Sequence, residues 1–217
     1  CTSCDYAANA EHATAAKQPL VPVQVPGEVI EVATPGCKTI EDVARYVGVP
    51  TAQTLKAVFF STEEAEPRLI FAVMRGDLEV NEAKLSHAVG GVALRPAEEE
   101  EIRAVGAVPG YASPIGVRSA YVVADDSVLL GDHFVVGANR EGYHLIGVQY
   151  GRDLEADLVA DIALARAGDP CPRCGGLLRA ERGIELGHCF KLGTRYTEPR
   201  GITYLDADGT ERPIVMG

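Results

Sequence analysis

The order of apolar and polar positions along the chain predicts a mixture of helices and strands. Apolar residues recur at helical spacing from Ile40 to Val47, so we expect an amphipathic helix there, with Thr39 as its cap and Gly48 at its end. Three further helical segments are expected, over residues 81–88, 97–105 and 158–167.

Two nearly continuous apolar runs, residues 56–60 and 68–74, predict the strands at the centre of a sheet. Apolar side chains at successive positions are typical of strands that are covered on both faces. Other strands are expected over residues 92–94, 120–124, 133–136 and 143–148, before a last hairpin that turns at Asp208 and Gly209.

Composition narrows the class of protein. The 217 residues are 47% apolar and 24% charged, which is typical of a soluble, globular chain of one to two domains. No apolar run approaches the roughly 18 residues that span a bilayer, and no signal segment opens the chain, so we expect a cytoplasmic protein with no membrane partner. The chain begins at Cys1 without an initiator Met and ends directly after an apolar stretch, so we also expect a piece of a longer protein.

The charge balance limits how the chain can contact nucleic acid. The formal net charge is −11, whereas domains that bind a phosphate backbone broadly and tightly usually carry a basic face. Any nucleic-acid contact must therefore be local, or must use parts that lie outside this chain.

Two Cys-x-x-Cys pairs, Cys1/Cys4 and Cys171/Cys174, enclose 166 residues that contain one other cysteine. A pair of thiolates spaced in this way can bind one zinc ion, and two pairs complete the tetrahedral coordination that structural zinc prefers. We therefore expect a structural Zn²⁺ that holds together the two ends of a large inserted segment. Metal-free thiols and disulfides stay open as alternatives, and a reducing compartment disfavours the disulfides.

Residues 182–196 read Arg-Gly-Ile-Glu-Leu-Gly-His-Cys-Phe-Lys-Leu-Gly-Thr-Arg-Tyr, a long and specific stretch that resembles bacterial-type prolyl-tRNA synthetase. It is similar to the part of the class II catalytic core that follows the family's editing insertion, and residues 5–9 are similar to the part that precedes it. The resemblance implies an α+β fold: an editing domain in which a mixed β-sheet is packed with helices, with flanking strands from a class II synthetase core. The implied parts are a core segment and linker over residues 1–25, the editing domain over 26–168 and a second core segment over 169–217.

Short motifs inside the insertion also resemble the editing domain, which hydrolyses alanine wrongly esterified to tRNA(Pro). A pocket built for proline cannot reject the smaller alanine by more than a few kcal/mol, so a second site must remove the wrong product. The implied partners are the 3′ end of tRNA(Pro) and its alanyl or prolyl esters. The parent enzyme is implied to be a homodimer that ligates proline to its tRNA with ATP and Mg²⁺. The motifs are residues 54–56 and 75–82, the Gly110-x-x-x-Pro114 loop, and residues 137–139 and 142–144.

Three side chains are candidates for the hydrolysis of the ester. Lys56 is expected to place its ammonium against the ester oxygen or a 3′-end phosphate; a solvated lysine at a helix end is the alternative. Asp125 matches an acidic position of the family's pocket and could orient water or the aminoacyl ammonium, although Asp126 adjoins it and a turn aspartate is the alternative. His144 resembles the histidine that shapes the amino-acid site, as a hydrogen-bonding imidazole or a base, unless it is simply packed.

Other residues are expected to bind substrate. The loop from Gly110 to Pro114 offers exposed amides for the terminal adenosine. Gly137 and Asn139 offer close backbone approach, although an ordinary tight turn explains them equally well. By family position, the proline pocket of the parent enzyme is lined by Glu185 and His188.

Two other functions stay open. A free-standing deacylase that works in trans does not explain the presence of residues 182–196. A non-catalytic, zinc-bearing tRNA-docking module would use Lys56 for phosphate contact alone. Deacylation assays separate this module from an enzyme, because the module would be hydrolytically silent.

Overall fold

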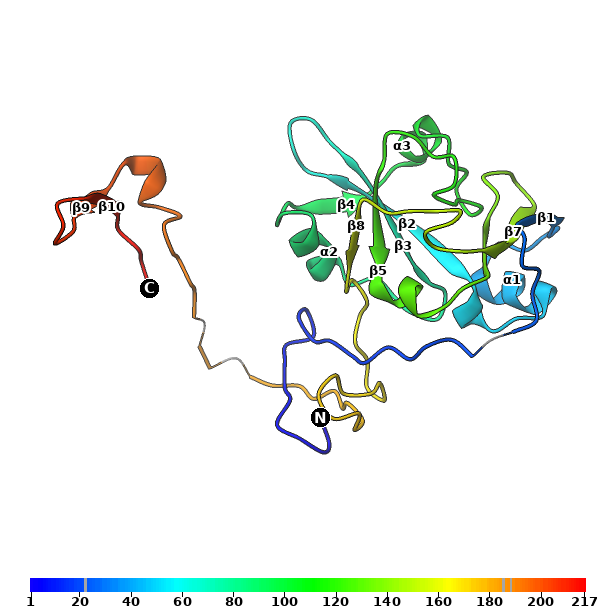
Figure 1. Cartoon of the computed structure of the whole chain (residues 1–217), viewed down its shortest axis with the longest axis horizontal. Coiled ribbons are helices and arrows are strands. Elements are labelled where there is room, and N and C mark those ends of the chain that lie inside the picture. Colours follow the sequence, from blue (N-terminus) through cyan, green and yellow to red (C-terminus); the bar gives the residue numbers. More distant parts are fainter. Residues whose placement is uncertain (22, 185, 188) are drawn as a thin grey trace. The chain divides into compact units, whose positions relative to one another are not determined.

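The computed structural model describes residues 1–21, 23–184, 186–187 and 189–217. The chain forms two compact units, Cys1–Ala180 and Glu181–Gly217, and each is described by itself (Figure 1). Among the described residues, no helix has the length and apolar character required to cross a bilayer.

A five-stranded sheet with the order β4-β2-β3-β5-β8 forms the centre of the first unit (Figure 1). Strand β3 pairs with β2 in antiparallel and with β5 in parallel orientation, so the sheet is mixed. All seven residues of β3 are buried, which confirms the prediction of central strands covered on both faces. The strands are β2 (Leu55–Thr62), β3 (Leu69–Arg75), β4 (Leu94–Pro96), β5 (Tyr121–Asp125) and β8 (Leu158–Ala160).

A second sheet of three antiparallel strands, in the order β1-β7-β6, adjoins the first. Thr54, directly before β2, forms a parallel bridge with Val135 in β6, so the two sheets meet at the start of β2. Strand β1 was not predicted, because its four residues form a strand only by pairing with β7, more than a hundred residues away. The strands are β1 (Ile30–Ala33), β6 (Phe134–Gly137) and β7 (Tyr143–Val148).

The helices begin and end at local signals in the sequence. In α1 (Ile40–Val47), the Thr39 side chain accepts a hydrogen bond from the Asp42 amide and Gly48 adopts φ +81°, as predicted. Helix α2 (Glu82–Ala88) is capped by Asn81. The remaining helical elements of this unit are α3 (Glu99–Ala104) and the 3₁₀ turns η1 (Thr51–Gln53) and η2 (Asp126–Leu130).

The predicted helix over residues 158–167 is wrong. Leu158–Ala160 is strand β8, which pairs in parallel with the end of β5. The next residues stay extended because the Ile162 carbonyl accepts a hydrogen bond from Asn81 and the Leu164 amide donates one to Glu79. Backbone pairing on both sides of the segment therefore outweighs its helical spacing of apolar residues. The strand predicted over residues 92–94 also lies later, at β4.

Apolar side chains cover both faces of the larger sheet. On one face, Phe71 packs with Phe134 of the smaller sheet. On the other face, Ile70 packs with Leu85 of α2. The first unit is therefore a layered α+β fold, with the smaller sheet on one side of β3 and helix α2 on the other, which confirms the predicted mixture of elements and the mixed sheet.

The second unit, Glu181–Gly217, contains a short 3₁₀ turn and a hairpin. The hairpin turns between Asp206 and Thr210, which confirms the turn predicted at Asp208 and Gly209. The Thr197 hydroxyl donates to the Ile214 carbonyl at 2.6 Å and fastens the end of the hairpin to the turn. The elements are η3 (Glu198–Arg200), β9 (Thr203–Leu205) and β10 (Glu211–Pro213).

Candidate functional site

Asn139 holds the predicted substrate loop in place. It lies in the turn between β6 and β7, where it adopts a positive φ of 50°. Its side-chain nitrogen donates to the carbonyls of Ser113 and Ile115, both at 2.9 Å, and its side-chain oxygen accepts from the Ser113 amide at 3.0 Å. The Asn139 amide also donates to the Tyr111 carbonyl. One asparagine thus fixes the loop that runs from Gly110 to Pro114.

Gly137 brings strand β6 against the same loop. A Cβ atom at this position would lie 2.1 Å from the Tyr111 carbonyl oxygen, a distance that no side chain can tolerate. Gly137 is also the register partner of His144 in β7. The structure therefore gathers four of the predicted substrate positions and the predicted histidine around one part of the smaller sheet.

His144 is buried and held by a residue that the sequence did not suggest. Its Nδ1 lies 2.6 Å from the hydroxyl oxygen of Thr34, which is itself fully buried. The ring also lies 5.7 Å, centroid to centroid, from that of Tyr111. Burial lowers the pKa of His144 below its ordinary value. The geometry favours a neutral imidazole, because a buried ring without a charged partner resists protonation.

Lys56 is the second residue of β2 and its side chain is half-buried. Burial lowers the pKa of Lys56, while the nearby carboxylate of Glu79 opposes this shift. Glu79 itself pairs with Arg166 at 2.5 Å. Among the described residues, the Lys56 ammonium makes no hydrogen bond or ion pair. A partly buried, unpaired lysine with a lowered pKa is a candidate for a functional group.

Asp125 is fully buried and both of its carboxylate oxygens are engaged. Oδ1 accepts from the Ser127 amide at 3.0 Å, and Oδ2 accepts from the Ile162 amide at 3.0 Å and from Lys17 Nζ at 2.8 Å. The adjoining Asp126 also pairs with Lys17, but its side chain is 48% exposed. Asp125 thus lies inside the fold, whereas Asp126 lies at its surface.

The three predicted catalytic side chains come from two sheets, which meet at the start of β2. Lys56 and Asp125 lie in the five-stranded sheet, two strands apart, and His144 lies in the smaller sheet. No hydrogen bond or ion pair joins any two of them, although all three belong to the described part of the chain. The predicted residues Glu185 and His188 lie outside the described residues.

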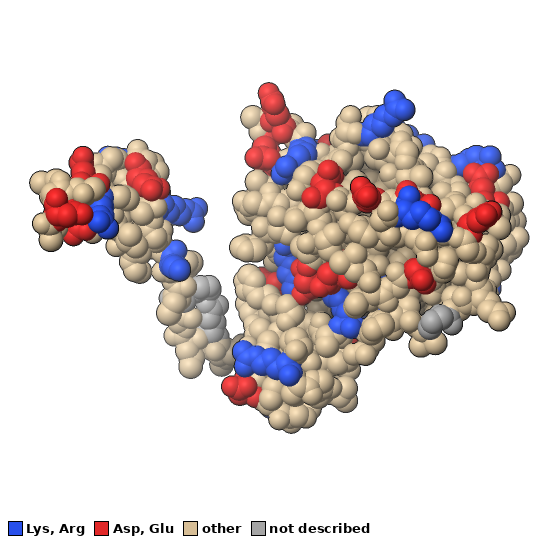
Figure 2. All heavy atoms as spheres, viewed as in Figure 1, with Lys and Arg blue, Asp and Glu red and all other residues tan. Residues whose placement is uncertain are grey.

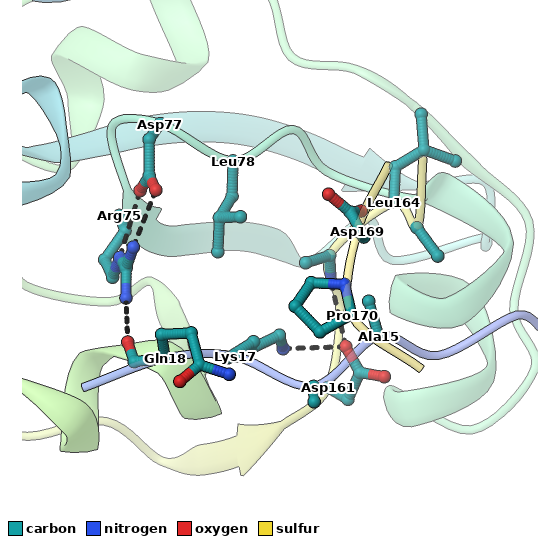
Figure 3. Close-up of a pocket in the computed structure, with 13 residues that line it drawn as sticks. Ala15, Lys17, Gln18, Arg75, Asp77, Leu78, Asp161, Leu164, Asp169 and Pro170 are labelled. Carbon is teal, nitrogen blue, oxygen red and sulfur yellow. Dashed lines mark hydrogen bonds and ion pairs between the residues drawn. The ribbon is translucent and has the colours of Figure 1, made fainter. Parts of the chain in front are cut away.

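A pocket with a volume of about 160 Å³ opens beside the N-terminal linker (Figure 3). The linker forms one wall, the turn after β3 forms another, and the segment after β8 closes the third side. None of the predicted catalytic side chains lines this pocket. Figure 3 shows that Lys17 and Asp161 point toward each other at its edge, while Arg75 is held between Asp77 and the carbonyl of Gln18.

Both acidic and basic residues lie on the face drawn in Figure 2. Acidic and basic side chains are interspersed over the first unit, and the described residues on this face form no continuous basic patch. The described residues on this face therefore offer no broad basic surface for a phosphate backbone.

The four paired cysteines converge at one point of the first unit. The Sγ atoms of Cys1 and Cys174 are 3.5 Å apart, and those of Cys4 and Cys171 are 3.7 Å apart. All four Sγ atoms lie within 4.8 Å of one another, and all are free thiols. Zinc–sulfur bonds of about 2.3 Å in a tetrahedron require sulfur atoms about 3.8 Å apart. The cluster therefore has the size and donor set that zinc requires.

Comparison with known proteins shows the family to which the chain belongs. The family model for the aminoacyl-tRNA editing domain matches residues 34–154, which include Lys56, Asp125, His144 and the Gly110 loop, and the chain belongs to this family. Over its full length the chain is 48% identical to the proline–tRNA ligases of Dehalococcoides mccartyi and Salinispora tropica. It spans 37% of the length of each of these relatives.

Two solved structures share the fold at lower identity. A hypothetical protein aligns with a TM-score of 0.54 and 20% identity, over 63% of this chain and 91% of that chain. A candidate trans-editing enzyme for prolyl-tRNA synthetase aligns with a TM-score of 0.50 and 22% identity, over 63% of this chain and 87% of that chain. These two structures show that the fold is shared even where the sequence identity is low.

Proposed function

We propose that this chain is the editing part of a proline–tRNA ligase and that it hydrolyses alanine wrongly attached to tRNA(Pro). Membership of the aminoacyl-tRNA editing family and the 48% identity to proline–tRNA ligases support this proposal. The free ammonium of Lys56 is the observation that carries it. Hydrolysis of an ester builds negative charge on the carbonyl oxygen, and an unpaired, partly desolvated cation stabilises that charge strongly.

His144 and the loop beside it form the substrate side of the proposed site. The neutral imidazole, held by Thr34, contacts the alanyl group through the ring nitrogen that faces away from that residue. The amides of the Gly110 to Pro114 loop contact the terminal adenosine of the tRNA, and Asn139 keeps the loop in its bound shape. Because these groups are fixed before substrate arrives, little ordering is required on binding.

Asp125 has a structural role in this proposal. Its buried carboxylate already accepts hydrogen bonds from Ser127, Ile162 and Lys17, so it holds the end of β5 rather than orienting water. Glu185 and His188 keep the role implied by their family position, which is to line the proline pocket of the parent enzyme.

The test compares the hydrolysis of alanyl-tRNA(Pro) with that of prolyl-tRNA(Pro) by the wild-type chain and by Lys56→Met. We expect preferential loss of alanine with the wild type and a decrease of about 100-fold or more in the variant, as for removal of an oxyanion donor. Thermal unfolding should change little, because the ammonium makes no ion pair. Lys38→Met, at an exposed lysine, is the control. A wild-type chain that binds tRNA without hydrolysing it would favour the docking module instead.

We also propose that Cys1, Cys4, Cys171 and Cys174 bind one structural zinc ion. Four thiolates leave no open coordination position, so the metal would join the two ends of the inserted segment and take no part in hydrolysis. Elemental analysis of the chain purified under reducing conditions should give one zinc per chain. Cys171→Ser should lose the metal and Cys37→Ser should keep it. A wild-type chain that is metal-free under these conditions contradicts the proposal.

The last part of the proposal concerns the longer parent enzyme. We propose a cytoplasmic homodimer that ligates proline to tRNA with ATP and Mg²⁺, in which the hairpin of β9 and β10 belongs to the class II core. The resemblance of residues 182–196 to that core supports this assignment.

A further inference from the structure

A lysine of the N-terminal linker lies among three carboxylates of the folded domain. Lys17 Nζ is 2.8 Å from Asp125 Oδ2 and 2.7 Å from Asp161 Oδ1, and it also pairs with Asp126. The Lys17 side chain is only 9% exposed. One oxygen from each of the three aspartates lies within 4.8 Å of the others, a spacing that suits a metal ion. The ammonium of Lys17 takes the place of such an ion.

The surrounding charges keep this ammonium protonated. Burial lowers the pKa of Lys17, but the carboxylates of Asp125, Asp126 and Asp161 outweigh it and leave the pKa above its ordinary value. A second lysine, Lys84, contacts Asp161 at 2.9 Å and donates to the Ala163 carbonyl at 2.8 Å. Three carboxylates thus face two ammonium groups, and loss of Lys17 would raise the uncompensated negative charge from one to two in a largely buried place.

The linker on either side of Lys17 is bonded to the same part of the domain. The Arg75 side chain donates to the Gln18 carbonyl at 2.7 Å, and the Ala16 amide donates to the Pro170 carbonyl at 2.8 Å. Asn81 donates to the carbonyls of residues 10 and 11, both at 3.2 Å. These bonds join the linker to the turn after β3, to the cap of α2 and to the segment that leaves β8.

We propose that Lys17 is a built-in cation that occupies the three-carboxylate site of Asp125, Asp126 and Asp161 and thereby fastens the N-terminal linker to the domain. Lys17 is a positioning residue. It holds the linker in place through its ion pairs with Asp125, at the end of β5, and with Asp161, after β8. Lys17 lies outside residues 34–154, which match the editing family. Its ion pairs therefore join the linker to the family's domain.

Loss of Lys17 should have two measurable consequences. Without Lys17, the linker loses its central attachment, so its amides should exchange with solvent faster. The three carboxylates also regain free oxygens at a spacing that suits a divalent ion, so the variant should respond to a metal that the wild type ignores.

The experiment measures hydrogen–deuterium exchange of peptides covering residues 10–20 in the wild type, in Lys17→Met and in the control Lys38→Met, each with and without millimolar Mn²⁺. We expect exchange in Lys17→Met to be about tenfold faster or more, with a marked return toward wild-type protection when Mn²⁺ is added. The wild type and Lys38→Met should show slow exchange that Mn²⁺ does not change.

Asp126→Asn provides a milder variant, because this aspartate is half-exposed and its loss removes one of the three partners of Lys17. It should raise linker exchange by a smaller factor in a chain that stays folded. If hydrogen–deuterium exchange of the linker in both variants equals that of the wild type, the proposal that Lys17 fastens the linker to the domain is wrong. Faster exchange in Lys17→Met without a response to Mn²⁺ would overturn the cation site. Neither measurement uses tRNA, so a failure of the proposed deacylation would appear separately.

Discussion

Burial of His144 determines which form of its imidazole can take part in hydrolysis. The side chain packs beside Tyr111, and its Nδ1 is paired with the hydroxyl of Thr34. Burial lowers its pKa, so the neutral ring is the stable form in the folded chain. In the unfolded chain the same residue titrates near its ordinary value of about 6.5. Folding is therefore coupled to the loss of a proton from this side chain.

The sign of this coupling gives a pH-dependent prediction. Because the folded pKa is below the unfolded one, the contribution of His144 to stability is complete above about pH 6.5 and is lost as the pH falls toward the folded value. The wild-type free energy of unfolding should fall more steeply between about pH 7.5 and about pH 5 than that of His144→Gln. Urea unfolding measures this difference.

His12→Gln, at an exposed histidine, is the matched control and should keep the wild-type slope. Alanyl-tRNA hydrolysis should also decline on the acid side as the ring becomes charged. A His144→Gln chain with the same pH slope as the wild type would show that this histidine keeps an ordinary pKa.

The paired cysteines follow from their spacing alone, whereas the candidate residues for hydrolysis come from the family resemblance. Lys56 and His144 are candidates through family motifs, but the partner of His144 was missed because Thr34 lies 110 residues away. Lys17 was missed for a similar reason, since a lysine in a polar linker gives no local sign that it contacts Asp125, 108 residues later. Contacts of this range depend on the tertiary fold, which periodicity does not contain.

At the scale of elements, prediction succeeded where the deciding signals are local. Helix α1 has the predicted bounds because a threonine cap, an apolar stripe and a terminal glycine all lie within ten residues. Strand β8 was taken for a helix because its spacing of apolar residues fits both elements. Pairing with β5 decides between them, and strand β1 depends in the same way on β7.

The approach of β6 to the substrate loop gives a prediction for Gly137→Ala. The new methyl group would lie 2.1 Å from the Tyr111 carbonyl oxygen, a backbone atom that cannot rotate away. Strand and loop must therefore separate, which should cost about 1–3 kcal/mol of unfolding free energy and lower alanyl-tRNA hydrolysis. Urea unfolding and deacylation rates of the purified variant measure the two effects.

Gly27→Ala is the control for this substitution, because a methyl group there meets nothing within 4 Å. It should leave the stability unchanged or slightly increased, since alanine restricts the unfolded chain. Equal stability of the two variants would mean that β6 and the loop are not in close contact in solution.

At the scale of the whole molecule, the residues proposed for editing and the cysteine cluster all lie in Cys1–Ala180. The second unit contributes a hairpin and several exposed apolar side chains, such as Ile184 and Leu186, which are 89% and 96% exposed. Exposed apolar residues of this kind are typical of a surface that packs against further protein. The proposed function assigns hydrolysis to the first unit and attachment to a synthetic core to the second.

This division predicts that a chain ending at Ala180 keeps the editing reaction. The first unit has its own core on both faces of β3 and its own cysteine cluster, so deletion of residues 181–217 should leave its unfolding midpoint nearly unchanged. Alanyl-tRNA hydrolysis should stay within about twofold of the full chain, because independent units retain their own sites. Calorimetry and deacylation of the two chains test this. A shortened chain that is folded but inactive would place part of residues 181–217 in the editing reaction itself, and the free ammonium of Lys56 would then be insufficient for it.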